Sequence, residues 1–296
     1  MVTCFGLTRR SLLAGAAGAG LASGKAVAAV ADPRLVVLDW GLLETVLALG
    51  IAPIAAAETG NYARAAATLP VPPSVTDIGL RLDPDLEWIH VLRPGAILIN
   101  AAQSAQISVL KPLAPIWTFS IYDGSGEPLR NAETVTRDLG ARIGRRAEAA
   151  ALVASTMHNL RPLPGYDSRP LLLFSFLDAT HIALYDRSSL AGNVLDRLGL
   201  DNAWTQASGG WGVVPLSLPA LAQSPEARLI CFGPVPLSAQ SMMAQSPLWR
   251  DLPAIRAGRI RLLPPVWNYG ALPTAARIAD LIRTALARAD GQDVIG

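Results

Sequence analysis

The side chains best suited to chemistry in this sequence are aromatic, and they favour a binding surface over a catalytic centre. Trp267 and Tyr269 follow an apolar, strand-like run near the C-terminus, and Trp40 follows the first such run. Open α/β sheets bind ligands beyond the carboxyl ends of their strands, so these rings stand where a pocket would form. Trp211 lies in the glycine-flanked loop 208–212, where a ring has little core to pack into. We expect all four to contact a ligand; for Trp211 a local structural plug is the alternative.

Arg81 is the candidate for a polar contact with that ligand. It ends the loop Gly79-Leu80-Arg81, just before Asp83-Pro84, which we interpret as the N-cap and first residue of a helix running to Leu92. A guanidinium group can donate two parallel hydrogen bonds to an anionic group. A solvated surface charge is the alternative interpretation of this residue.

Catalytic and cofactor motifs are absent from the sequence. There is no Gly-x-Ser-x-Gly elbow, no phosphate-binding Walker loop and no His-Glu-x-x-His pair. His90, His158 and His181 are far apart and are predicted to be surface or structural residues. We therefore expect no enzyme, no cofactor and no metal site. An exported hydrolase or reductase remains the hypothesis from a different class, because catalytic residues need not be neighbours in sequence.

The N-terminus resembles a twin-arginine export signal. Arg9-Arg10 is followed by a weakly apolar stretch, 12–24, and by a small-x-small cleavage site, Ala26-Val27-Ala28, with Ala29-Val30-Ala31 as the alternative. Lys25 interrupts the apolar stretch before it reaches the ~20 residues that a spanning helix needs. We expect residues 1–28 to be removed on export to the periplasm; a retained membrane anchor is the alternative.

Removing the signal changes the charge balance. The whole chain carries 25 basic and 23 acidic side chains, and residues 1–28 hold three of the basic ones and no acid, which leaves 22 against 23. The sequence has only two lysines and no basic cluster with interleaved aromatics, so nucleic acid is not expected as a partner. Cys231, then the sole cysteine, is predicted to be a buried core residue.

Strand-like and helix-like runs alternate in both halves of the chain, which predicts an α/β fold with parallel strands. The ~268 residues left after cleavage suit two lobes, which we place at 29–130 and 162–296. Between them, 131–161 has apolar residues at helical spacing and is predicted to be one long connecting helix. A surface helix of a single domain is the alternative. Trp88 and Trp249 lie on apolar helix stripes and are predicted to be core residues.

Several strings place the chain near a known family. They are 47–53, 61–62, 77–81, 201–204, 247–249, 256–259 and 266–270. On these strings the chain resembles the periplasmic ferric hydroxamate siderophore-binding proteins of ABC importers, over nearly the whole mature length. The resemblance implies two Rossmann-like α/β lobes joined by one long rigid helix, with a shallow ligand cleft between them. It also implies a monomer that delivers a ferric siderophore to an inner-membrane permease.

The resemblance also assigns roles within that cleft. The family's ligand-contacting arginine falls on Arg81, and its cleft aromatics fall on Trp40, Trp211, Trp267 and Tyr269. The arginine would donate to the hydroxamate oxygens around iron, and the aromatics would contact the apolar siderophore frame.

The sequence departs from the family pattern at several positions. A family tyrosine that helps hold the hydroxamate falls near Gln103, which we keep as a ligand-binding candidate, and a family tryptophan near Ala65 is missing. These changes predict a pocket that is wider or more polar. The acidic residues with which the family docks its permease fall on Ser108 and Pro219, neither acidic. Glu44, Glu58 or Glu226 are the alternatives for docking.

A binder of another bulky chelate on the same scaffold is the second hypothesis. Cobalamin suits an aromatic cleft. Haem would require an axial ligand such as Tyr269. A carboxylate siderophore would require several basic groups, and only Arg81, with Arg64 as a possible second, is evident.

Overall fold

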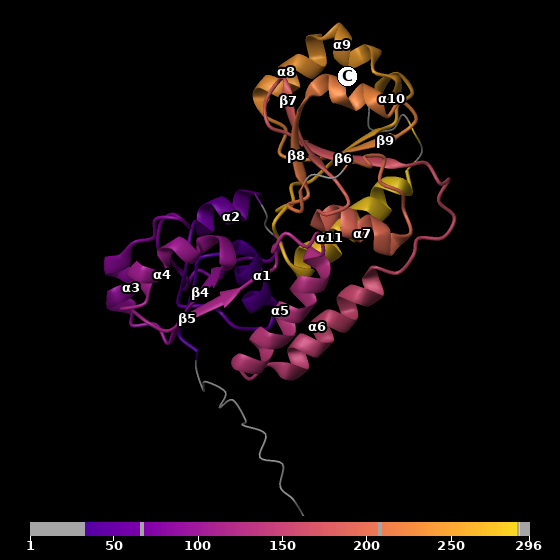
Figure 1. Ribbon diagram of the computed structural model, residues 1–296. Helices are drawn as coiled ribbons and strands as arrows, with labels where there is room; N and C mark the ends of the chain where they lie inside the picture. The colour runs from indigo at the N-terminus through magenta and orange to yellow at the C-terminus, as the bar shows by residue number, and fades with distance from the viewer. Residues whose placement is uncertain (1–32, 66–67, 207–208, 289, 291–296) are drawn as a thin grey trace, which may run out of the picture.

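The computed structural model describes residues 33–65, 68–206, 209–288 and 290, and these form two α/β lobes (Figure 1). Each lobe is built on a five-stranded sheet, with the orders β3-β2-β1-β4-β5 and β10-β9-β6-β7-β8. The predicted export signal, 1–28, lies outside the described residues. Within them, no helix is both long enough and apolar enough to cross a membrane.

The N-terminal lobe has an all-parallel sheet, as the alternation of runs predicts. Its strands are β1 (Leu35–Val37), β2 (Ala55–Ala56), β3 (Thr76–Asp77), β4 (Ala96–Asn100) and β5 (Ile116–Phe119). Its helices are α1 (Trp40–Ala48), α2 (Thr59–Ala65), α3 (Leu86–Leu92), the 3-10 helix η1 (Ala101–Gln106) and α4 (Ile107–Leu110). Alternate strand residues are buried on opposite faces, under α3 and α4 on one side and under α1 and α5 on the other.

The C-terminal lobe has a mixed sheet. Its strands are β6 (Leu171–Phe176), β7 (His181–Tyr185), β8 (Val213–Ser217), β9 (Arg228–Phe232) and β10 (Ile260–Leu263). Its helices are α7 (Leu190–Leu198), the 3-10 helix η2 (Leu218–Gln223), α8 (Leu237–Gln245), α9 (Pro247–Asp251), α10 (Pro253–Arg256) and α11 (Leu272–Leu286). The β6–β7 and β7–β8 pairs are antiparallel, so the prediction of parallel strands is wrong at this edge.

The predicted single connecting helix is wrong. The segment forms two helices, α5 (Pro128–Arg142) and α6 (Arg146–Asn159), which pack against each other as a hairpin (Figure 1). Gly144 adopts a left-handed φ of 72° and ends α5, and a Cβ on Gly140 would lie 2.5 Å from the Cβ of Ala149. The apolar spacing continues through the turn because both helices bury a face, so periodicity alone did not reveal the break.

Helix α11 ties the lobes together. It packs against α1 of the N-terminal lobe, against α5 and α6, and against α7 of its own lobe (Figure 1). One hydrophobic core cluster runs from β1 and α1 through α5 to α7 and α11. The two lobes are therefore joined by a continuous core as well as by the chain.

Predictions for single residues are confirmed for some residues and wrong for others. Trp249 and Cys231 are buried in the core, as predicted, at 5% and 0% exposure. Trp88 is 49% exposed, because in α3 its neighbour Ile89 faces the sheet instead. The cap of α3 is Asp85, whose carboxylate accepts from the backbone N–H of Trp88, two residues after the predicted Asp83.

Candidate functional site

The carboxyl edge of the N-terminal sheet is built around the point where the strand order reverses. β1 and β4 are neighbours there, and the residues that follow them interact directly. Asp39 caps α1 by accepting from the Leu42 N–H at 3.0 Å, and Asn100 donates its side-chain amide to the other Asp39 oxygen at 2.6 Å. Trp40, the first residue of α1, donates its indole N–H to the Ala57 carbonyl at 3.1 Å. Trp40 thus lies just beyond the carboxyl end of a strand, as predicted.

Rings from both lobes meet at this edge. Trp267 lies 4.7 Å from Trp40 between ring centroids and 5.7 Å from Tyr269, and Tyr269 lies 5.1 Å from Tyr122. We call these four residues the inter-lobe aromatic cluster. Trp40 and Tyr122 follow β1 and β5 of one lobe, while Trp267 and Tyr269 follow β10 of the other. The indole nitrogen of Trp267 is buried with no hydrogen-bond partner in the described part of the chain.

Arg81 is stacked on the inter-lobe aromatic cluster. Its guanidinium carbon lies 4.1 Å from the Trp40 ring centroid and 4.9 Å from that of Trp267, distances at which cation–π attraction operates. Its Nε donates to Glu58 at 2.5 Å. Among the described residues its two terminal nitrogens have no acceptor. The arginine is thus fixed in place with its outer donors uncommitted.

Gln103 has a different place from the one expected. It is 3% exposed, and its amide donates to the carbonyls of Leu38 and Arg81 at 3.0 and 2.9 Å. Its side-chain oxygen accepts from the Asn100 N–H, which completes a capping box at the start of η1. Gln103 therefore lies beneath the Arg81 loop and supports it. Both donors of its amide and one lone pair of its oxygen are thus engaged within the protein.

Trp211 is half exposed and has no ring contact with the inter-lobe aromatic cluster in the described residues. Its loop is nevertheless tightly held. A Cβ on Gly210 would lie 2.4 Å from the Gly124 carbonyl oxygen, and one on Gly212 would lie 2.2 Å from Ser189. Residues 210–212 are therefore pressed against the β5–α5 loop of the first lobe and the start of α7, with the Trp211 ring left accessible.

Sequence analysis missed two residues of the site. Tyr122 follows β5, so the strand-end rule that selected Trp40 would have found it; its hydroxyl donates to the carbonyls of Asn268 and Gly270, both at 2.9 Å. Glu58 follows β2 by the same rule. It was considered only as a permease-docking residue, although its partner is Arg81.

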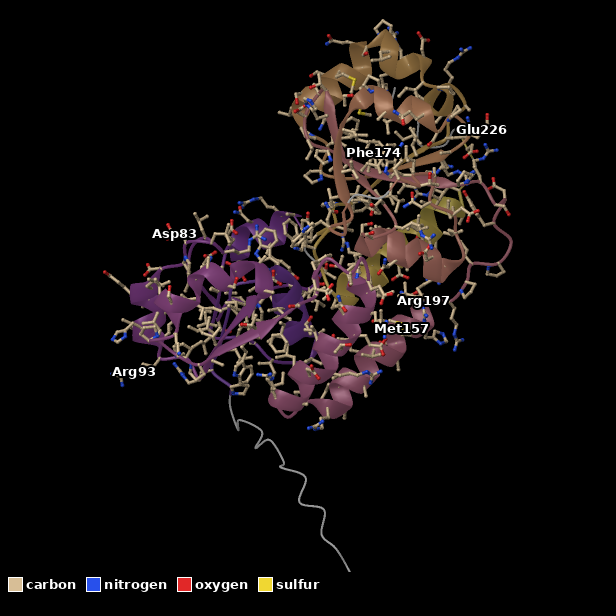
Figure 2. All side chains as sticks on the ribbon, in the orientation of Figure 1. Asp83, Arg93, Met157, Phe174, Arg197 and Glu226 are labelled. Atoms are coloured by element: carbon tan, nitrogen blue, oxygen red, sulfur yellow. The ribbon has the colours of Figure 1, made fainter. Side chains whose placement is uncertain are left out.

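The other candidate residues for permease docking differ in exposure. Glu44 is completely buried and accepts from the backbone N–H groups of Ala271 and Thr274 at the start of α11, so it cannot reach a partner protein. Glu226 is exposed at the outer edge of the C-terminal lobe, where it pairs with Arg259 (Figure 2). Ser108 and Pro219 are exposed.

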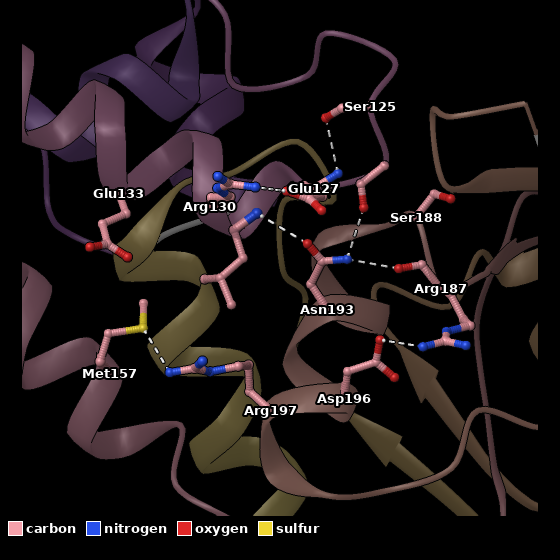
Figure 3. Close-up of a pocket in the computed structure, with 12 residues that line it drawn as sticks. Ser125, Glu127, Arg130, Glu133, Met157, Arg187, Ser188, Asn193, Asp196 and Arg197 are labelled. Atoms are coloured by element: carbon pink, nitrogen blue, oxygen red, sulfur yellow. Dashed lines mark hydrogen bonds and ion pairs between the residues drawn. The ribbon is translucent and has the colours of Figure 1, made fainter.

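A pocket of about 560 Å³ lies elsewhere, where α5 and α6 meet α7 (Figure 3). Four of its charged groups pair with one another, Arg130 with Glu127 and Arg187 with Asp196, while Arg197 donates to the Met157 sulfur. Asn193 crosses between the lobes, donating to the Gly126 carbonyl at 3.1 Å. None of the predicted site residues lines this pocket, so we interpret it as part of the junction between lobes.

A second pocket, of about 460 Å³, lies at the carboxyl ends of β9 and β10 and is lined by apolar groups that include Pro234, Met243 and Leu263. It opens on the same sheet edge from which Trp267 departs. Among the described residues no three His, Cys, Asp or Glu side chains converge to hold a metal ion, and all three histidines are exposed.

Comparison with known proteins agrees with this architecture. Residues 35–266 match the model of a family described as periplasmic binding protein. The chain is 31% identical to the iron(3+)-hydroxamate-binding protein FhuD of Escherichia coli (strain K12) over 264 residues, which cover 88% of this chain and 89% of that protein. It is 24% identical to the Fe(3+)-citrate-binding protein YfmC of Bacillus subtilis (strain 168), over 80% of this chain and 75% of that one.

A solved structure gives the same picture. The Fe3+-Desferal-bound siderophore-binding protein FhuD of Vibrio cholerae superposes with a TM-score of 0.79 at 31% identity, covering 86% of this chain and 98% of that one. This chain therefore belongs to the periplasmic binding protein family. The family resemblance that the sequence motifs indicate is confirmed, and so is the two-lobe α/β fold.

Proposed function

We propose that this chain captures a ferric hydroxamate-type siderophore in the periplasm and delivers it to an inner-membrane ABC permease, without catalysing a reaction. One observation carries the proposal: Arg81 is stacked on Trp40 and Trp267 with its two terminal nitrogens uncommitted. The Escherichia coli and Vibrio cholerae relatives, named for hydroxamate binding and for bound Desferal, support the ligand class.

The chemistry of such a ligand suits this arrangement. A hydroxamate siderophore fills the octahedral oxygen shell of its iron, so a protein must recognise the outside of the complex and needs no metal ligands of its own. The outer donors of Arg81 suit the hydroxamate oxygens. Within the inter-lobe aromatic cluster, the partly exposed Trp267 and Tyr269 offer flat walls to the apolar frame, and the buried Trp40 supports Arg81. Trp211 extends those walls, and Gln103 contributes by holding the Arg81 loop.

The remaining parts of the proposal follow from the sequence. Residues 1–28 are the twin-arginine signal, and the mature protein acts as a monomer in the periplasm. The first lobe, 29–130, and the second, 162–296, each present one wall of the site. Among the docking alternatives, Glu226 is the exposed carboxylate of the second lobe; it precedes β9 and lies at the opposite end of that sheet from Trp267.

The test is a titration of intrinsic tryptophan fluorescence with ferrichrome, ferrioxamine, a ferric citrate-type siderophore, cobalamin and haem. Saturable quenching by the hydroxamate chelates is expected. Arg81→Ala should weaken that binding about 10- to 100-fold, because a hydrogen bond to a charged group contributes ~1.5–3 kcal/mol.

Arg130→Ala is the matched control, because Arg130 is exposed on α5 and pairs only with Glu127 among the described residues. It should leave the affinity unchanged. Tight binding of cobalamin or haem alone would contradict the hydroxamate assignment and favour the second hypothesis. Equal affinity in wild type and Arg81→Ala would contradict the assigned site.

A further inference from the structure

The strongest observation beyond the proposed function is a carboxylate set against the ligand-facing arginine. Glu58 Oε2 accepts from Arg81 Nε at 2.5 Å, and the side chains of the two residues are only 14% and 28% exposed. The backbone N–H of Arg81 also approaches this oxygen, at 3.5 Å. The pair is thus largely shielded from solvent, so water and salt screen the attraction between its two charges only weakly.

Hydrogen bonds from neighbouring residues fix the position of Glu58. Its backbone adopts a left-handed φ of 52°, and its N–H donates to the Gly79 carbonyl at 2.8 Å. Asn61 donates its amide to the second carboxylate oxygen at 3.0 Å. Both carboxylate oxygens are therefore engaged, and the side chain is held between the ends of β2 and β3.

The electrostatic surroundings keep this carboxylate ionised. Partial burial opposes ionisation, but the hydrogen bonds from Arg81 and Asn61 and the positive charge of Arg81 lower the pKa of Glu58 below its ordinary value. The next basic side chain, Arg64, donates to Asn61 and not to Glu58. Two acidic side chains nearby have partners of their own: Asp77 accepts from the backbone N–H groups of Thr59 and Gly79, and Asp39 is bound by Asn100 and by the start of α1.

Resting on the proposed function, we infer that Glu58 is a specificity-determining residue: it cancels the charge of Arg81 without occupying the terminal nitrogens. The site thereby offers hydrogen-bond donors without a net positive charge. A neutral or cationic ferric complex can accept from Arg81 at no electrostatic disadvantage. An anionic complex meets the carboxylate of Glu58 next to the donors, and this repulsion lowers its affinity.

A matched ligand series tests this inference on the wild-type protein. Ferrioxamine B carries one positive charge on its terminal amine; acetylation of the amine gives a neutral complex, and succinylation gives an anionic one with the same iron shell. We expect the succinylated complex to bind about 10-fold or more weakly than ferrioxamine B. Equal affinity across the series, or tightest binding of the anionic complex, would overturn the inference.

Glu58→Gln then isolates the residue. The amide oxygen can still accept from Arg81, but the negative charge is lost, so the ratio of cationic to anionic affinity should fall about 10-fold. Glu133→Gln is the control: it makes the same change in the exposed α5 pair with Arg137 and should leave the ratio as in wild type. A ratio unchanged by Glu58→Gln would overturn the inference.

The outcomes distinguish a failure of the proposed function from a failure of the inference about Glu58 alone. If wild type binds none of the three ferrioxamines, the proposed function fails and the inference falls with it. If wild type binds them without regard to charge, only the inference fails. The wild-type series does not depend on the folding of any variant, so it can overturn the inference even where Glu58→Gln folds poorly.

Discussion

Two carboxylates lie where the lobes meet, and they are held in opposite ways. Glu58 is partly exposed and faces a guanidinium group on the ligand side. Glu44 is fully buried about one turn inside α1, and no lysine or arginine pairs with it among the described residues. Its acceptors are filled by the Ala271 and Thr274 N–H groups and by the Thr274 hydroxyl at 2.7 Å, all at the N-terminus of α11.

The difference shows in their protonation. Partial burial opposes ionisation of Glu58, yet its hydrogen bonds and Arg81 lower its pKa. For Glu44, burial raises the pKa to about 7, against the opposing effect of the bonds from Ala271 and Thr274. A carboxylate that serves ligand selection is kept charged, while one that joins the lobes acts through hydrogen bonds to a helix terminus.

The largest effect should come from removing the buried group. Glu44→Ala leaves the Ala271 and Thr274 N–H groups buried without an acceptor, so at pH 5 it should lower the free energy of unfolding by about 3 kcal/mol. Urea denaturation measures this. Glu133→Ala, in an exposed ion pair, should change it by less than about 0.5 kcal/mol. Equal effects of the two changes would contradict a structural role for Glu44.

The raised pKa of Glu44 predicts how the stability of the protein depends on pH. The folded-state pKa of Glu44, about 7, lies above its ordinary value of 4.5, so the folded protein holds this proton more tightly than the unfolded chain. The stability associated with the protonated group is therefore complete below about pH 4.5 and is lost as pH rises to about 7. This loss amounts to ~3 kcal/mol in total.

Glu44→Gln removes that proton linkage. Relative to the variant, wild type should lose stability between pH 4.5 and 7.5, as measured by urea denaturation at a series of pH values. Subtracting the variant's curve cancels the other carboxyl groups, several of which have lowered pKa values and act in the opposite sense. Parallel curves for the two proteins would contradict a raised pKa at Glu44.

The smallest effect should arise on the ligand side, at Gln103. Gln103→Leu removes the donors to the Leu38 and Arg81 carbonyls, so it should lower the free energy of unfolding by about 1–2 kcal/mol. The Arg81 loop loses support, and hydroxamate affinity should fall about 3-fold, far less than in Arg81→Ala. Fluorescence titration of the two variants measures both. A loss equal to that of Arg81→Ala would restore Gln103 as a direct ligand contact.

Sequence patterns predicted most strands and the class of fold because burial leaves a periodic trace. The strands β1, β4, β6 and β9 are short runs rich in buried apolar residues. The same trace failed between α5 and α6. Apolar spacing reports which residues are buried and not whether the axis reverses, and the reversal depended on Gly140 and Gly144, which a continuous helix tolerates at modest cost.

The candidate site could likewise be predicted only in part. The rule that ligands gather at strand ends placed Trp40 and Trp267 at the carboxyl ends of strands in two sheets, and the structure brings their rings to 4.7 Å. The rule could not assign partners. Glu58 and Arg81 are 23 residues apart in sequence, and Tyr122 meets Asn268 across 146 residues.

Residue types and local spacing were enough to predict the two-lobe α/β architecture and the family, and they selected the aromatic and arginine residues of the candidate site. Tertiary packing determined which of those residues lie together, which carboxylate pairs with Arg81 and which one joins the lobes. Those outcomes depend on burial and on contacts between distant segments, and only the packing of α11 against α1 and of one sheet edge against the other fixes them.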